Sequence, residues 1–162
     1  VVHFLSILSI QLSSICYSAM DLKLTLENPQ KTTMCRNRNA DRCLKLEESA
    51  FRVHRGMLHS SPVLERLLMK GARTMLHLDY LKADQKHFTP IGLNMVIEWM
   101  YGTRIEFSTE HLTDALAAAF ALEMYDMVEA VEQAVLKYQS ISHSTRSRFT
   151  NDALCWFADI DF

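Results

Sequence analysis

The sequence predicts one α+β domain in which short, half-buried strands precede and interrupt a series of amphipathic helices. Around residues 43–53, apolar and polar side chains alternate with a period of two, as in strands with one buried face. Further along, apolar residues recur mostly at three- and four-residue steps, as in helices with one buried face. A chain of 162 residues with 49% apolar and 22% charged residues has ordinary globular composition and enough apolar surface for one core.

Residues 43–53 predict a hairpin-like pair of strands. In the first strand Leu44 and Leu46 share one face, and in the second Phe51 and Val53 do so, with an acidic turn between them. Residues 74–79 alternate in the same way and predict a third strand, and Ile105 and Phe107 predict another short one.

Prolines and capping residues mark the predicted helix boundaries. Pro62 fits the first turn of a helix with Ser61 or Ser60 as N-cap, so the helix before it ends at about His59. Gly71 closes the helix that Pro62 opens. Later helix starts are predicted at Thr89-Pro90, at Ser108 and at Asp126, the last as a capping box with Asp as the cap.

The helical spacing also predicts which residues pack together. Gly92 is expected to be a weak point of its helix, whereas the alanines at 117–119 let another helix approach closely. Of Met69, Met75, Met95, Met100, Met124 and Met127, most are expected to fill the core. The predicted core consists of Leu58, Leu67, Leu68, Leu93, Ile97, Leu116 and Leu122.

Several stretches, in chain order, resemble the BTB/POZ domain. Residues 51–58 resemble its strand ending in Phe-x-Val-His-Arg/Lys followed by x-x-Leu, and Ser61-Pro62 follows as in the family. Residues 21–26 resemble its opening strand, 97–105 its helix-to-strand junction and 116–124 its penultimate helix. The resemblance covers about residues 21–139. It implies a small three-stranded sheet flanked by about five helices, with a C-terminal helical hairpin.

The resemblance implies a protein–protein interaction module that forms homodimers or heterodimers and recruits partner proteins, in some members for transcriptional regulation. The alternative use in the family is as a substrate adaptor of a cullin-type ubiquitin ligase. The family's cullin contact tends to include a hydrophobic-x-Glu motif after the second helix. The matching positions are Ala72, Arg73 and Thr74, which lack both anchors, so weak cullin binding is expected.

Residues 1–20 contain no Lys, Arg, Asp or Glu and allow several interpretations. They resemble a signal peptide without its basic start, or a transmembrane segment diluted by serines, either of which would make the protein secreted or membrane-attached. An unstructured leader with Met20 as the true start is a further alternative. As an amphipathic helix, they would present an apolar stripe of Leu5, Leu8, Leu12 and Ile15.

In many BTB domains such a helix packs on the partner subunit. The predicted dimer interface therefore combines the stripe of residues 5–15 with Met57, Leu58 and His59. By the same resemblance, Asp21 and Arg55 face a charged groove beside the interface. Residues 140–162 are predicted to form a flexible tail, whose apolar end at 153–162 starts another helix, docks on the domain or is ill-ordered.

No catalytic or cofactor motif is present in the sequence. Glycine-rich phosphate loops, His-Glu-x-x-His and Gly-x-Ser-x-Gly are missing, so neither an enzyme nor a cofactor or metal site is predicted, and His54 is interpreted as a structural histidine. A net charge of -2 disfavours nucleic-acid binding by this chain alone. Cys16, Cys35, Cys43 and Cys155 form no Cys-x-x-Cys pair and are interpreted as reduced thiols of a cytoplasmic or nuclear protein.

Overall fold

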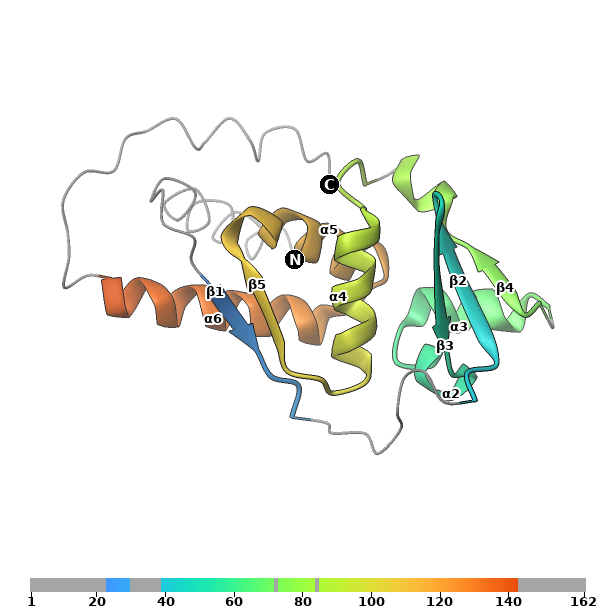
Figure 1. Ribbon diagram of the computed structural model, residues 1–162, viewed down its shortest axis with the longest axis horizontal. Coiled ribbons are helices and arrows are strands. Elements are labelled where there is room, and N and C mark those ends of the chain that lie inside the picture. The colour runs from blue at the N-terminus through green and yellow to red at the C-terminus, as the bar shows by residue number, and fades with distance from the viewer. Residues whose placement is uncertain (1–22, 30–38, 72, 84, 143–162) are drawn as a thin grey trace.

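The computed structural model describes residues 23–29, 39–71, 73–83 and 85–142, and in it two small sheets lie on opposite sides of helix α4 (Figure 1). The elements are, in order, β1 (Lys23–Leu26), β2 (Arg42–Leu46), β3 (Ser49–Val53), α2 (Arg55–Leu58), α3 (Pro62–Met69), β4 (Met75–His77), the 3-10 helix η1 (Asp79–Ala83), α4 (Pro90–Met100), β5 (Ile105–Ser108), the 3-10 helix η2 (Thr109–His111), α5 (Leu112–Ala121) and α6 (Tyr125–Ser142). The α+β fold predicted from the sequence is confirmed.

The larger sheet has three strands in the order β3-β2-β4. Strands β2 and β3 form an antiparallel hairpin, and β4 returns parallel to β2 after α2 and α3. Leu44 pairs with Phe51 on one side and with Leu76 on the other. Leu44 and Leu46 are fully buried, as the alternation predicts, because this face of the sheet packs against the core.

A second sheet of two strands lies across α4 from the first. Strand β1 pairs antiparallel with β5, so that Leu24 lies opposite Phe107 and Leu26 opposite Ile105. All four of these side chains are buried. The sequence predicts both strands but not their pairing, because residues so far apart in the chain give no local signal of contact.

Two predicted N-caps are confirmed. Ser61 Oγ accepts a hydrogen bond from the Leu64 backbone N–H at 3.2 Å and donates one to the Leu122 carbonyl at 2.6 Å. Thr89 Oγ1 accepts from the Gly92 N–H at 3.2 Å and donates to Asp114 Oδ1 at 3.0 Å. Each capping side chain therefore also joins its helix to a second element.

Of the other two predicted helix starts, the one at Ser108 is confirmed as the residue before η2 and α5, although its side chain does not cap, and the one at Asp126 lies inside α6. Helix α6 begins at Tyr125, and the expected cap Asp126 instead accepts a hydrogen bond from Trp99 Nε1 at 2.8 Å. Ser108 precedes η2 but makes no capping bond, since its hydroxyl donates to Glu110 Oε1 at 2.9 Å. A competing partner takes the predicted cap in both places. Helix α6 also continues to Ser142, beyond the domain end expected at residue 139.

Helices α4 and α5 are in close contact, and Gly92 is the reason. A Cβ atom at this position would lie 2.1 Å from the Asp114 carbonyl oxygen and 3.0 Å from the Ala118 Cβ. Helix propensity marks Gly92 as a weak point of its helix, and the structure adds a packing role, because the contact requires the absence of a side chain. The small residues at 117–119 are buried, and the close helix approach predicted from them is confirmed.

Most of the predicted core is buried. Leu58, Leu68, Leu93, Ile97, Leu116 and Leu122 belong to the core, whereas Leu67 is only half-buried against it. Met95, Met100, Met124 and Met127 are buried as expected, but Met69 and Met75 are exposed. Within the described residues, no helix is both long and apolar enough to cross a membrane.

The two glycines in helices give opposite predictions for replacement by alanine. Gly92→Ala should lower the free energy of unfolding by about 1 to 3 kcal/mol or more, because the new methyl group meets backbone atoms of α5. Gly56→Ala in α2 meets nothing within 4 Å and should be neutral or raise stability by about 0.4 to 1 kcal/mol. Urea unfolding of both variants measures the difference, and equal midpoints would contradict the close α4–α5 contact.

Candidate interaction surfaces

The junction between β3 and α2 is tied to the end of α4 by His54. Its backbone N–H donates to the Tyr101 hydroxyl at 2.9 Å, and its Nδ1 lies 2.8 Å from the same oxygen. The two rings also meet edge to face, with centroids 5.9 Å apart. The interpretation of His54 as a structural histidine is confirmed.

Asp41 holds the start of α2 from outside the helix. Its Oδ1 accepts a hydrogen bond from the Arg55 backbone N–H at 2.8 Å, and its Oδ2 lies 3.2 Å from Arg42 Nη1. The bond from the Arg55 N–H is the largest influence and lowers the pKa of Asp41; desolvation opposes it, and the nearby charges of Arg42 and His54 lower the pKa by smaller amounts. Arg55 is thus anchored through its backbone, and its side chain is exposed. Asp21 lies outside the described residues, so the charged groove of Asp21 and Arg55 stays a prediction.

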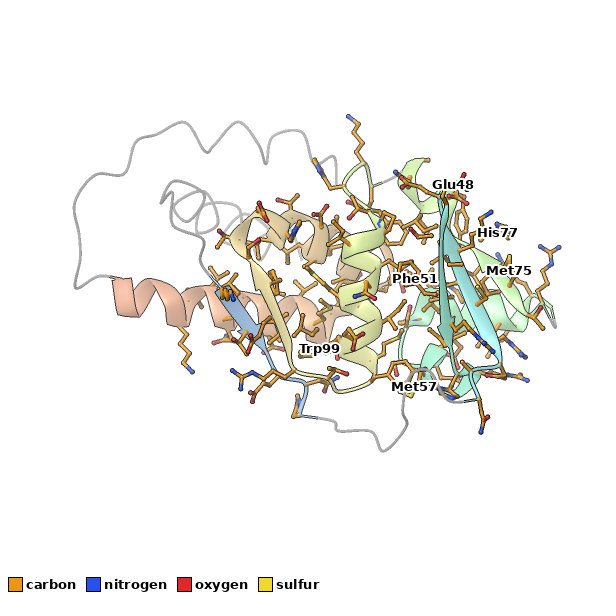
Figure 2. All side chains as sticks on the ribbon, in the orientation of Figure 1. Glu48, Phe51, Met57, Met75, His77 and Trp99 are labelled. Atoms are coloured by element: carbon orange, nitrogen blue, oxygen red, sulfur yellow. The ribbon has the colours of Figure 1, made fainter. Side chains whose placement is uncertain are left out.

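The α2 surface contains only part of the predicted dimer interface (Figure 2). Met57 is half-buried, and His59 is exposed with its Nδ1 3.0 Å from Glu65 Oε1. Leu58 is fully buried within the protomer, which corrects its assignment to the interface: its side chain belongs to the core. The remaining interface residues, Leu5, Leu8, Leu12 and Ile15, lie outside the described part of the chain.

A groove runs along the side of the domain where α3, β4 and η1 meet, and we call it the α3–β4 groove. It consists of two adjoining hollows of about 400 and 340 Å³, which share Leu67, Lys70 and Tyr80 in their walls. In Figure 2, Met75 and His77 lie on β4 at the outer side of the molecule, away from α4. The sequence gives no local signal of this groove, because α3, β4 and η1 meet only in the folded chain.

One wall of the groove contains an ion pair between α3 and the α5–α6 turn. Arg66 Nη2 lies 2.5 Å from Glu123 Oε1, and Nη1 donates to Oε2 at 3.1 Å. The paired guanidinium lowers the pKa of Glu123. Arg73, one of the expected cullin-contact positions, lines the groove. Thr74 lies beside it, exposed, with its carbonyl bound by the Cys43 N–H at 2.8 Å, and Ala72 is outside the described residues.

A third hollow, of about 510 Å³, lies between α4 and β5. Its apolar wall includes the exposed side chain of Ile91 and the buried Met95. Arg104 lies on its rim and pairs with Glu106 at 3.2 Å. Among the residues that the structure describes, no group of three or more His, Cys, Asp or Glu side chains is arranged to hold a metal ion.

Comparison with known proteins agrees with this architecture. The family model of the BTB/POZ domain matches residues 31–139, and the chain belongs to this family of protein–protein interaction modules. The chain is similar to zinc finger and BTB domain-containing protein 18.3 of Xenopus laevis, with 28% identity over 66% of this chain and 20% of that protein. It is also similar to protein 18.2 of the same frog, with 32% identity over 51% of this chain and 17% of that protein. The protein 18 of Danio rerio shares 24% identity over 71% of this chain and 21% of its own length.

The matched part of the chain therefore corresponds to about a fifth of each of these relatives. No solved structure matched the chain. The comparisons thus show that the chain belongs to the BTB/POZ family. They do not show that it shares the activities of the longer relatives.

Removing the Asp41 carboxylate should destabilise the domain in a pH-dependent way. Asp41→Ala is expected to cost about 1 kcal/mol or less at pH 7, because the Arg55 N–H loses its acceptor at a site that water reaches. The folded pKa of Asp41 lies below the ordinary 3.8, so this contribution is present above that value and is lost as the pH falls through the folded pKa. Urea unfolding of wild type and variant at neutral and strongly acidic pH measures it. A stability difference that is the same at both pH values would contradict the assignment.

Proposed function

We propose that this BTB/POZ domain forms homodimers, or heterodimers with other BTB proteins, and recruits further proteins as a dimer. Membership of the family over residues 31–139 carries the proposal. The described surface supports it, because it offers open grooves and an α2 face with half-buried Met57 and exposed His59. Contact with macromolecules suits such a surface better than enclosure of a small substrate does.

The proposed interface joins this α2 face to the apolar stripe of residues 5–15. An exposed apolar stripe next to a small domain normally marks an association surface. In a two-fold dimer each subunit covers the other's stripe, so the same residues serve on both sides. Arg55 and Asp21 would flank the contact and leave a charged groove for the recruited protein. Leu58 supports this surface from beneath, because its burial fixes the position of α2.

A role in transcriptional regulation is the setting that we propose for this dimer, in the nucleus or the cytoplasm. The similar proteins are named for zinc fingers as well as for a BTB domain. This chain contains no Cys-x-x-Cys pair and has a net charge of -2, so contact with nucleic acid would come from other parts of an assembly. A cullin adaptor is the weaker alternative, because the positions expected to anchor a cullin carry Ala72, Arg73 and Thr74. A secreted or membrane-attached protein is the alternative that depends on residues 1–20 alone.

The leader stripe gives the direct test of the dimer. Deleting residues 1–19, or replacing Leu8 by Glu, should raise the dissociation constant of the dimer at least tenfold. The deletion removes the apolar contact, and the glutamate places a charge within it. Ser14→Glu is the matched control, since it adds the same charge on the opposite side of the predicted helix and should leave the dimer unchanged. Sedimentation velocity over a concentration series measures all four proteins.

Equal dimer affinity of the deleted and full-length chains would show that residues 1–19 do not contribute to dimerisation. If the full-length chain is strictly monomeric at micromolar concentration, the proposed dimer is contradicted. Thermal unfolding at high protein dilution checks that each variant keeps the monomer fold, which does not depend on the stripe.

A further inference from the structure

The α3–β4 groove carries positive charge that nothing in the described structure neutralises. Lys70 is shared by both hollows, and Arg73 lines one of them. Neither side chain forms an ion pair with another described residue, and both are exposed. The other cation and the acid in the wall, Arg66 and Glu123, neutralise each other. The groove therefore suits an occupant with negative charge.

The same groove also exposes apolar surface. Five large apolar side chains are exposed in the described part of the chain, and two of them, Met75 and Tyr80, line this groove. Met75 is 42% exposed, and Tyr80 is 53% exposed although it lines both hollows. Apolar side chains gathered beside cations fit a segment that alternates apolar and acidic residues.

One segment of this chain has that composition. Residues 151–162 contain Asp152, Asp159 and Asp161 and no Lys or Arg. They also hold the large apolar residues Leu154, Trp156, Phe157, Ile160 and Phe162. This segment lies outside the described residues, and docking on the domain is one of the alternatives that its sequence allows.

We propose that residues 151–162 dock into the α3–β4 groove of their own chain. Trp156 and Phe157 would enter the hollows beside Met75 and Tyr80, and the aspartates would pair with Lys70 and Arg73. The length of chain allows it. Helix α6 has 18 residues and is about 27 Å long, and it begins beside Glu123 at the groove. The fourteen residues from 143 to 156 span up to about 46 Å, which is enough to return along the helix. This docking does not depend on dimerisation.

Photo-cross-linking in the full-length chain tests the proposal. A benzophenone amino acid replaces Trp156, and mass spectrometry maps its cross-links after irradiation. The expected cross-links fall between residues 63 and 85. Lys70→Glu should lower their yield several-fold, and so should Asp159→Asn combined with Asp161→Asn. Lys23→Glu is the matched control, since it reverses an equally exposed lysine on β1, outside the groove, and should leave the yield unchanged.

The source of the segment is decided by mixing isotope-labelled and unlabelled copies before irradiation. Cross-links within one copy support the proposal. Cross-links between copies would contradict it, because they would place the segment in the groove of a second molecule. Cross-links spread over the surface, or a yield that Lys70→Glu and Lys23→Glu change equally, would also overturn it and leave the groove to an acidic segment of another protein.

Discussion

The close contact between α4 and α5 at Gly92 is the constraint on which the rest of this domain depends. A Cβ atom at position 92 would collide with the Asp114 carbonyl of α5. The two helices can therefore approach this closely only because residue 92 is a glycine. Thr89 strengthens the same contact, because it caps α4 and donates to the Asp114 side chain. Near the other end of α4, Trp99 donates to Asp126 of α6 and so fixes a third helix.

Helix α4 also joins two sheets that would be too small to be stable alone. A pair of strands such as β1 and β5 is marginal in water unless it packs on other elements. The carbonyl of Trp99 accepts a hydrogen bond from Asn28, just after β1, at 2.8 Å. Tyr101, just after α4, binds His54 at the end of β3. The positions of α2 and of the α3–β4 groove are therefore tied to the position of α4 by these bonds.

Local patterns predicted the parts of the fold that depend on local interactions. The alternation of Leu44 and Leu46 identified a strand because one face of the sheet is buried, and Ser61 and Thr89 were recognised as caps because they act on their own helices. The BTB/POZ resemblance supplied the overall architecture that periodicity alone does not give.

The errors concern residues whose partners are distant in sequence. Gly92 looked unfavourable because helix propensity does not register a neighbouring helix. Asp126 was expected to cap a helix, but Trp99 of another element is its partner. Most of the six methionines were expected in the core, and the exposed positions of Met69 and Met75 became visible only in three dimensions. The α3–β4 groove was missed for that reason.

Native-state hydrogen exchange tests most directly whether α4 unites the domain into one cooperative unit. Amides of Val96 and Ile97 in α4, of Leu44 in β2 and of Phe107 in β5 should all exchange with the free energy of global unfolding, since neither sheet can open while α4 remains packed. Exchange in β2 at a clearly lower free energy than in α4 and β5 would show that the three-stranded sheet unfolds separately, and it would contradict this account.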